Sequence, residues 1–360
     1  METSIEKRAM GAIVGAFIGD ALALGPHWYY DLDEQRREYG EWVDTYTAPR
    51  VGRYHEGLKA GDQSQSGYIL KLMIKSILEN NGYDHGEFCN KLDKDLFTKI
   101  DGTAFNGPGG YTSQSIREAY KQRVTDGKDW KYVVSFADTT EALERTLALS
   151  VVYAGDFKEL AHSVAQNTYL TQKDEIVGAM GVAYGSVLAL LIQGQPLDEN
   201  ISKILMGLVK KGDLPFHATT GDNLTPDKKS KPVSKAGSFS SPDALLTPSN
   251  IATIAKDPKV QIEPAWKVSQ VYGMPCAIYH VLPAAYYLAS RFNDDFESAV
   301  LHAVNGGGQN QARAILTGAL VGAQVGIDEI PAQFIQGLNE GKEILTLAKA
   351  LTSISETHQV

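Results

Sequence analysis

Residues 305–326 read NGGGQNQARAILTGALVGAQVG. Three successive glycines, which include Gly307 and Gly308, precede Gln309 and Gln311, and a helix-like segment of small residues follows. Glycine permits a tight turn and a close backbone approach to a ligand, and the first N–H groups of a helix point at whatever lies in front of them. The stretch therefore predicts a ligand cradle at the start of a helix. It is not a P-loop, since it lacks the GxxxxGK[ST] pattern.

The rest of the chain repeats the helical pattern. Apolar residues recur at steps of three and four, and no run of alternating β-branched residues competes with them. Many segments are dense in Gly and Ala, which lets helix backbones approach closely, and no fixed repeat period indicates a solenoid. We expect an all-α fold: a single-domain orthogonal bundle of many helices over residues 1–360. The expected helices are 5–24, 68–79, 88–100, 113–124, 141–153, 157–167, 174–193, 199–210, 275–291, 296–304, 312–325 and 332–355.

One segment departs from this pattern. Residues 212–250 are rich in Pro, Gly, Ser, Thr and Lys, and such a composition buries too little apolar surface to form a helix. Because apolar helices resume on both sides, we interpret it as a polar insertion within one domain, either a lid over a site or an inert linker.

Composition excludes several classes of partner. The chain has 34 Lys and Arg against 43 Asp and Glu, a net charge of −9, and it has no basic run, so nucleic acid is not expected. No stretch of 18 or more apolar residues predicts a membrane span, and Asp20 interrupts the apolar N-terminal stretch. The two cysteines, Cys89 and Cys276, cannot form a disulfide framework, which favours a reducing, cytoplasmic location. The sequence does not fix the oligomeric state.

Two further polar clusters interrupt the apolar helical pattern. In GAFIGDALALGPHWYYD, Asp20 lies near the end of the first helix and His27 follows seven residues later. A carboxylate among apolar residues is costly to bury without a partner, so Asp20 is either a cap or ion-pair residue or part of a site. In KAGDQSQSGYILKLMIKSI, a polar loop enters a long helix, and Ser64 or Ser66 is most simply its N-cap.

Taken together, the three clusters resemble the ADP-ribosylglycohydrolase family, in which a GxxxGDxxG segment, a TDDT loop and a GGDTDT loop converge on one cleft. The resemblance runs from residue 9 to about 326, apart from the insertion. It includes GALVGAQVG and the preceding LPAAYYLASRFNDDFESAVLHAVNGGG. The PHWYYD segment is most similar to the J1-crystallin branch, which contains jellyfish lens proteins and related selenoproteins.

The resemblance implies a pair of magnesium ions in the active members, held by Asp and Thr side chains of the second and third motifs. In this sequence the aspartate positions hold Gln65, Ser66, Gln309 and Gln311. Neutral amides supply neither the charge nor the rigid oxygen array that magnesium requires. We therefore expect no metal and no other cofactor.

The first motif also differs, because His27 stands where active relatives often carry a glutamate. A histidine can transfer protons near neutral pH, although a packed, hydrogen-bonded role is the plainer interpretation. His55, shortly before the second motif, reads as an exposed loop histidine or as a residue lining the same cleft. Trp28, Tyr29 and Tyr30 either pack in the core or stack on a flat ligand.

The loop at 101–119 borders the cleft in active relatives. Its Asn106 and Gly107 begin a glycine-rich turn that could present backbone amides to an anion, although a plain turn explains it equally well.

Two functions remain open on this sequence. One is metal-independent binding, with or without hydrolysis, of a small nucleotide-like or other polar metabolite. Asp20 and His27 would be its catalytic residues, and Gln65, Ser66, Asn106, Gly107, Gly307, Gly308, Gln309 and Gln311 would bind the ligand. An ADP-ribose-like compound is the ligand that the resemblance implies, and a hydrolase or lyase of a small zwitterion is a variant. The other is a crystallin-like structural protein with a vestigial cleft, which the acidic charge and low cysteine content would suit.

Overall fold

The computed structural model describes residues 3–217 and 237–357, and this part of the chain contains helices and no β-strand. The predicted all-α fold is confirmed. The α-helices are α1 (Ile5–Leu24), α2 (Leu32–Tyr39), α3 (Gln65–Asn80), α4 (His85–Lys91), α5 (Gln114–Tyr120), α6 (Glu141–Val152), α7 (Phe157–Thr171), α8 (Glu175–Ile192), α9 (Ile201–Lys211), α10 (Asp243–Lys256), α11 (Val268–Tyr272), α12 (Ile278–Arg291), α13 (Phe296–Asn305), α14 (Asn310–Val325), α15 (Ala332–Gly337) and α16 (Gly341–Thr357).

Helices α1 and α14 form the most closely packed pair in the molecule, and both are buried along nearly their whole length. A glycine stripe on each helix makes this possible. A Cβ atom added at Gly15 would lie 2.2 Å from the carbonyl oxygen of Gly318, and one added at Gly318 would lie 2.2 Å from that of Gly15. The same reciprocal clash joins Gly11 and Gly322. The two backbones therefore touch directly, which fixes the ends of both helices relative to one another.

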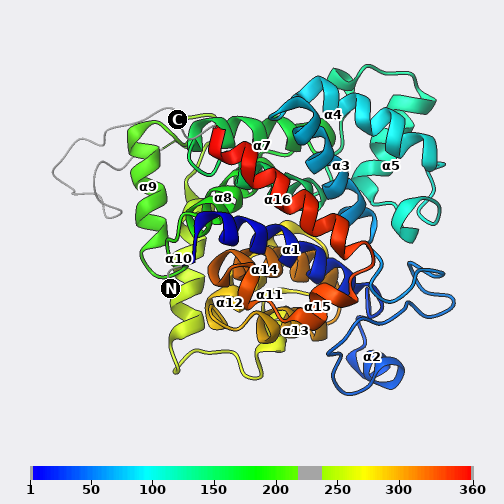
Figure 1. Ribbon diagram of the computed structural model, residues 1–360, viewed down its shortest axis with the longest axis vertical. Helices are drawn as coiled ribbons and strands as arrows, with labels where there is room; N and C mark the ends of the chain where they lie inside the picture. The colour runs from blue at the N-terminus through cyan, green and yellow to red at the C-terminus, as the bar shows by residue number, and fades with distance from the viewer. Residues whose placement is uncertain (1–2, 218–236, 358–360) are drawn as a thin grey trace.

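The other helices are layered around this pair (Figure 1). Helix α16 crosses over α1 and also packs on α3 and α6. Helices α12 and α13 lie against α14, while α7 and α8 pack on each other and on α6. The first helix and the last are thus both central, although they come from opposite ends of the sequence.

Several predicted helix boundaries were wrong. The stretch 88–100 is divided among α4, a π-turn at Leu92–Leu96 and a short 3-10 turn, and 113–124 ends in a second π-turn at Lys121–Thr125. The segment predicted as one helix over 332–355 is two helices. Asn339 lies in the break, where its backbone N–H and side chain bind Gly61, Ala60 and Asp62. The break therefore ties this segment to the loop that leads into α3.

The polar insertion is shorter than predicted. Helix α10 begins at Asp243, so residues 243–250 are helical and the expectation of a non-helical segment up to 250 was wrong. Phe216 and Phe239 are buried against each other, with ring centroids 4.9 Å apart, and they hold the two flanks of the insertion together. The part of the predicted lid or linker at 218–236 lies outside the described residues. Helices α2, α10 and α11 were not predicted, because they are short or rich in polar residues.

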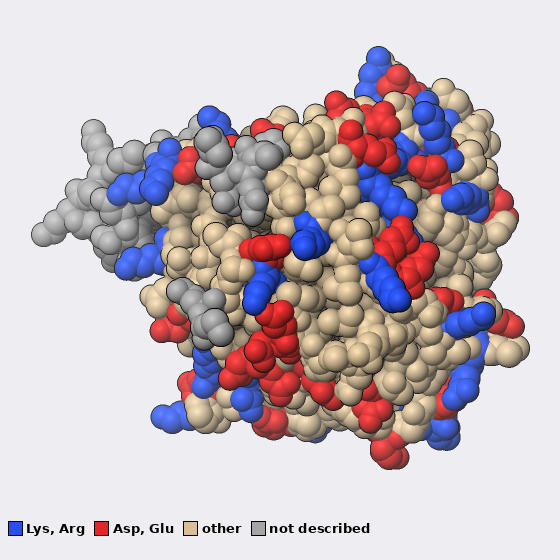
Figure 2. Space-filling model, in the orientation of Figure 1, with Lys and Arg blue, Asp and Glu red and all other residues tan. Residues whose placement is uncertain are grey.

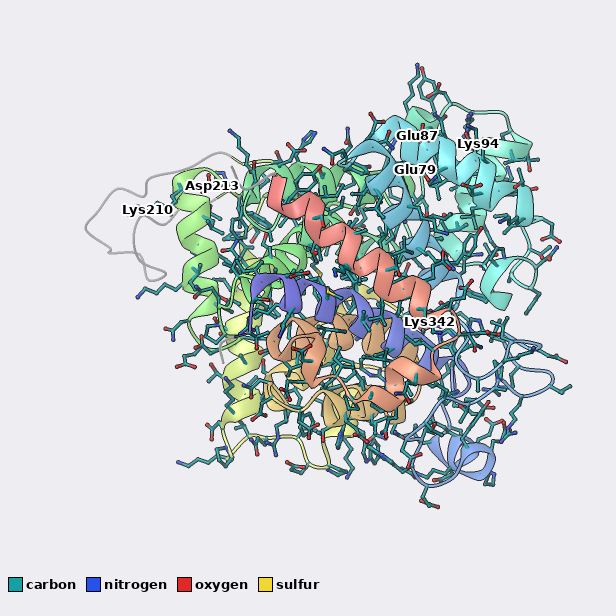
Figure 3. The ribbon with its side chains drawn as sticks, in the orientation of Figure 1. Glu79, Glu87, Lys94, Lys210, Asp213 and Lys342 are labelled. Atoms are coloured by element: carbon teal, nitrogen blue, oxygen red, sulfur yellow. The ribbon has the colours of Figure 1, made fainter. Side chains whose placement is uncertain are left out.

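Helix α8 is long and apolar enough to span a membrane by length and composition alone, with a mean hydropathy of 1.9. However, 78% of its residues are buried inside the fold, as expected for a core helix. On the face shown in Figure 2, Lys and Arg are scattered among Asp and Glu without a broad basic patch. In Figure 3, Lys210 and Asp213 lie at the end of α9, and Lys342 lies at the start of α16.

Candidate functional site

A cavity of about 110 Å³ lies where the starts of three helices meet. Helices α3, α6 and α14 each begin at it, and the segments around His27 and Tyr111 close its sides. Of the residues predicted to form a site, His27, Gln65, Ser66, Gln309 and Gln311 line this cavity. The structure therefore brings together residues from all three sequence motifs. The other lining residues are Trp28, His55, Ser64, Ile69, Tyr111, Ser113, Gln114, Arg117, Thr139, Glu141, Glu144 and Cys276.

Asp20 lies behind the cavity and does not line it. The carboxylate is 1% exposed, and it accepts hydrogen bonds from the backbone N–H of Ser64 at 2.9 Å and from its hydroxyl at 2.6 Å. Ser64 is the N-cap of α3, as predicted, and its hydroxyl oxygen accepts from the N–H of Ser66. Burial raises the pKa of Asp20 to about 6, although the bonds from Ser64 oppose that rise. In this arrangement Asp20 holds the start of α3 in place from behind.

Two histidines form a hydrogen-bonded pair at one wall of the cavity. His27 Nδ1 is 2.6 Å from His55 Nε2, and His55 Nδ1 is 2.6 Å from the carbonyl oxygen of Gly109. His55 is only 1% exposed, so its interpretation as an exposed loop histidine was wrong. It has a positive φ of 66°, which turns the loop inward and brings the ring against His27. Burial lowers the pKa of both rings, that of His55 to about 4.

These contacts constrain the protons of the pair. A carbonyl oxygen only accepts, so His55 Nδ1 donates to Gly109. His27 Nε2 lies 2.5 Å from Gln309 Oε1, which also only accepts. With a further proton between His27 Nδ1 and His55 Nε2, the three contacts hold one more proton than two neutral rings carry. A rotation of the Gln309 amide that exchanges its oxygen and nitrogen would let both rings stay neutral.

Two carboxyl groups also line the cavity, and the sequence analysis did not single them out. Glu141 and Glu144 stand one turn apart at the start of α6, and Glu144 is only 3% exposed. Glu141 Oε2 accepts from the hydroxyls of Thr139 and Ser115, and Glu144 Oε1 accepts from Thr140 Oγ1 at 2.6 Å. The sequence feature that could have identified them is DTTEALERT, in which two glutamates three residues apart lie in an otherwise apolar helix.

The pKa of both glutamates is raised. Burial is the main cause, and it raises the pKa of Glu141 to about 7, with the negative charge of Glu144 adding to the effect. Burial also raises the pKa of Glu144, against the hydrogen bonds from Ser66 and Thr140. A carboxyl group with a pKa near 7 exists in both protonation states at neutral pH, so Glu141 is suited to give and take protons.

Several polar atoms in the cavity wall are buried and have no hydrogen-bond partner among the described residues. Four lining side chains carry such atoms: Gln65 Oε1, Gln311 Nε2, Ser113 Oγ and Trp28 Nε1. Leaving a buried polar group unpaired costs about 1–3 kcal/mol. Four such atoms around one cavity are expected where a polar ligand supplies the missing hydrogen-bond partners.

The remaining predicted binding residues do not line the cavity. The Gly308 N–H donates to the carbonyl of Tyr29 at 2.7 Å, and the Gly307 carbonyl accepts from the buried Arg313 at 2.6 Å. The Asn106 side chain donates to Asp101 at 3.0 Å, and Gly107 packs against Ile100. These groups hold the loops that form the cavity walls.

The nearby Gly109 makes an unusually close approach. A Cβ atom at this position would lie 2.0 Å from the backbone nitrogen of Gln65, and the φ of Gly109 is 77°. The 101–119 loop can therefore pack against the first residue of α3 only with glycine here.

A wider hollow of about 670 Å³ opens outside the cavity, and Trp28 lines both. Tyr30, Tyr54 and Phe105 also line the hollow, and the rings of Tyr54 and Phe105 are stacked with centroids 5.7 Å apart. Tyr29, by contrast, is fully buried. The predicted aromatic triplet is therefore divided, with Tyr29 in the core and its two neighbours at the hollow.

The residues present do not fit a pair of magnesium ions. Gln65 and Gln309 use amide groups to bind Thr112 and His27, and none of the four positions carries an anionic oxygen. Within residues 3–217 and 237–357, no group of three or more His, Cys, Asp or Glu side chains is placed to hold a metal ion. Magnesium requires hard oxygen ligands in a near-octahedral array, which these amides do not supply.

Comparison with known proteins agrees with this fold. The family model for ADP-ribosylglycohydrolase matches residues 1–359. The chain belongs to the ADP-ribosylglycohydrolase family. Crystallin J1A of Tripedalia cystophora is 34% identical over 363 residues, which cover 96% of this chain and 97% of the crystallin. An uncharacterized protein of Archaeoglobus fulgidus is 23% identical over 354 residues, 98% of each chain.

A solved structure described as an ADP-ribosylglycohydrolase-related protein complex has the same fold. Its TM-score is 0.64 at 17% identity, and the match covers 98% of this chain and 99% of that one. Both the predicted family and its crystallin J1 branch are therefore supported by relatives that span almost the entire chain.

Proposed function

We propose that this member of the ADP-ribosylglycohydrolase family binds a small polar metabolite in the cavity and acts on it by metal-independent proton transfer. One observation carries the proposal: Gln65 and Gln311, which carry unpaired buried amide atoms, line the same cavity as a carboxyl group, Glu141, whose pKa is about 7. The amides provide orientation, and the carboxyl provides acid or base catalysis, which contributes typically about 10²–10⁴-fold in rate. In a hydrolysis, Glu141 would take the proton from the attacking water.

The residues first considered for catalysis receive different roles in this proposal. His27 Nε2 already faces Gln309 and its Nδ1 faces His55, so neither nitrogen is free for a substrate without a rearrangement. Asp20 is separated from the cavity by Ser64. We therefore assign His27 and Asp20 to positioning the walls and the start of α3, and Glu141 to the proton transfer.

The test begins with binding. A thermal-shift screen of small polar metabolites, with ADP-ribose as the family's first candidate, should yield ligands that raise the melting temperature. Incubation of each ligand with the protein, followed by NMR, should reveal conversion that Glu141→Gln lowers by at least about 100-fold. A control variant, Glu329→Gln, changes an exposed glutamate and should convert the ligand at the wild-type rate.

Conversion that stays unchanged in Glu141→Gln would remove this residue from the mechanism. A broad screen that finds no ligand at all would refute the binding function itself.

A second function is favoured by one relative. Crystallin J1A is 34% identical over nearly the full length, and a crystallin-like structural role needs a stable fold and no turnover. Very high abundance in one tissue, together with an absence of ligand response in the thermal-shift screen, would support this role over the enzymatic one.

A further inference from the structure

The side chains that line the cavity carry two unpaired donors, Gln311 Nε2 and Trp28 Nε1, and a separate group of acceptors formed by Gln65 and two glutamates. Gln65 Nε2 donates to Thr112 Oγ1 at 2.9 Å and lies 3.5 Å from the carbonyl oxygen of Pro108. Because the Thr112 hydroxyl already donates to the carbonyl of Asn106, it accepts from Gln65, and the orientation of this amide is fixed. The unpaired atom of Gln65, a lining side chain only 4% exposed, is therefore an oxygen acceptor.

Glu141 and Glu144 add two carboxyl groups to this acceptor. Glu141 accepts two hydroxyl hydrogens on Oε2, and Glu144 accepts from Thr140 and Ser66. Within the described residues neither forms an ion pair with Lys or Arg. A buried site with this much unused acceptor capacity is complemented by a group that carries positive charge and several N–H donors.

We propose that the cavity binds the protonated amine head group of a small metabolite, with Gln65, Glu141 and Glu144 as its acceptors. This inference rests on the proposed function and names its substrate class. An ammonium group has three donors and no acceptor, which matches the three acceptors in number and kind. A volume of about 110 Å³ suits a head group of a few heavy atoms, and the rest of the molecule would extend past Trp28 into the outer hollow.

The cavity is less suited to the alternatives. An anion could approach Arg117, but it would also meet the carboxyl groups of Glu141 and Glu144, whose charge would oppose its binding. A bare divalent ion would need a rigid oxygen cage, whereas no group of three metal-ligating side chains occurs in the described part of the chain. A neutral alcohol could bind, but it would leave both carboxyl groups without a charge partner.

The experiment compares ligands of similar size and different charge. Ligand-observed NMR titrations of the full-length protein would use n-propylammonium, 1-propanol and propionate at one pH and ionic strength, with magnesium chloride as a separate competitor. We expect propylammonium to bind at least about tenfold more tightly than the other two, and magnesium not to displace it. An equal or higher affinity for propanol or propionate, or displacement by stoichiometric magnesium, would overturn the inference.

Variants of the lining residues test whether propylammonium binds in the cavity. Glu141→Gln and Glu144→Gln should each weaken propylammonium binding by about tenfold or more, since each removes a poorly solvated charge. Gln65→Leu should weaken it to a smaller extent, and Glu329→Gln should have no effect. If Glu144→Gln does not fold by circular dichroism, the Glu141→Gln and Gln65→Leu variants still decide the result. Unchanged affinity in those two would also contradict the inference.

Failure of this inference can be told apart from failure of the proposed function. If a neutral or anionic metabolite binds in the cavity and propylammonium does not, the substrate class is wrong and the binding function stands. If neither the titrations nor the metabolite screen detects any ligand, both are wrong.

Discussion

At the scale of single residues, an unpaired amide in the cavity is expected to lower the stability of the ligand-free protein and to strengthen ligand binding. Gln311 is 5% exposed, and its Nε2 has no partner among the described residues. Replacing a buried unpaired polar group by an apolar group of similar shape is often neutral or stabilising. A residue that costs stability in the empty protein is retained most simply because a ligand uses it.

Gln311→Leu should therefore stabilise the ligand-free protein by about 1 kcal/mol while weakening ligand binding. Chemical denaturation of the wild type and the variant measures the first effect, and a thermal-shift titration with any ligand found in the screen measures the second. Destabilisation by the variant, together with unchanged ligand affinity, would return Gln311 to a packing role.

Glu141 offers a second test at this scale, through the pH dependence of stability. Its pKa in the folded protein is about 7, above the ordinary value of 4.5, because burial disfavours the charged form. The folded state thus binds more protons than the unfolded state between pH 4.5 and 7, and the contribution of Glu141 to stability falls as pH rises through this window.

Glu141→Gln removes this titration. Relative to the wild type, the variant should gain about 2 kcal/mol of unfolding free energy between pH 5 and pH 8, since a shift of one pKa unit corresponds to about 1.4 kcal/mol. Urea denaturation at both pH values measures the difference, with Glu329→Gln as the control that should show no such gain. A gain of the opposite sign would mean that Glu141 is ionised in the folded protein at neutral pH.

At the scale of secondary-structure elements, the glycine stripes of α1 and α14 decide how the site is assembled. The Gly15–Gly318 and Gly11–Gly322 contacts bring the two backbones together, and α14 begins at Gln309 and Asn310 beside the cavity. A shift of α14 along α1 would move Gln309 and Gln311 relative to Gln65. Helix packing, and not local sequence, sets the distance between the second and third motifs.

Gly318→Ala should destabilise the protein by about 1–3 kcal/mol or more, because its Cβ would lie 2.2 Å from the Gly15 carbonyl oxygen. Gly207 in α9 is the matched control. It is a helical glycine with open space around its Cβ position, so Gly207→Ala should stabilise by about 0.5–1 kcal/mol. Denaturation midpoints of the two variants should move in opposite directions, and equal effects would show that the glycine stripe is not tightly packed.

At the scale of the whole molecule, the two ends of the chain share one core. Helix α1 packs against α14, α16, α13 and α8, so elements from the first and last quarters of the sequence hold each other in place. A boundary between independent domains would have to cut through these contacts. This arrangement favours one cooperative unit over two domains.

We therefore expect residues 1–360 to unfold in a single transition. Far-ultraviolet circular dichroism and tryptophan fluorescence should give coincident denaturation curves, since Trp28 and Trp42 lie near the N-terminus and Trp266 lies far along the chain. Two separated transitions would contradict a single domain.

The sequence by itself determined the all-α fold, the family and the replacement of the aspartates. Helical periodicity is local, and the motif residues can be aligned without coordinates. It also indicated that Gln65, Ser66, Gln309 and Gln311 would meet. It did not reveal the roles of Glu141 and Glu144, because two acids at the start of a helix usually lie on its solvated face.

Only the tertiary structure decided which groups line the cavity. Of the two interpretations of His55, the structure supports the one in which it lines the cleft, where it is buried against His27. Asp20 supports the start of α3 from outside the cavity. Gly307 and Gly308 bind the protein's own backbone and an arginine. The physical reason is that burial and hydrogen-bond partners are set by residues from distant parts of the chain, and these two properties decide whether a polar side chain supports the fold or binds a ligand.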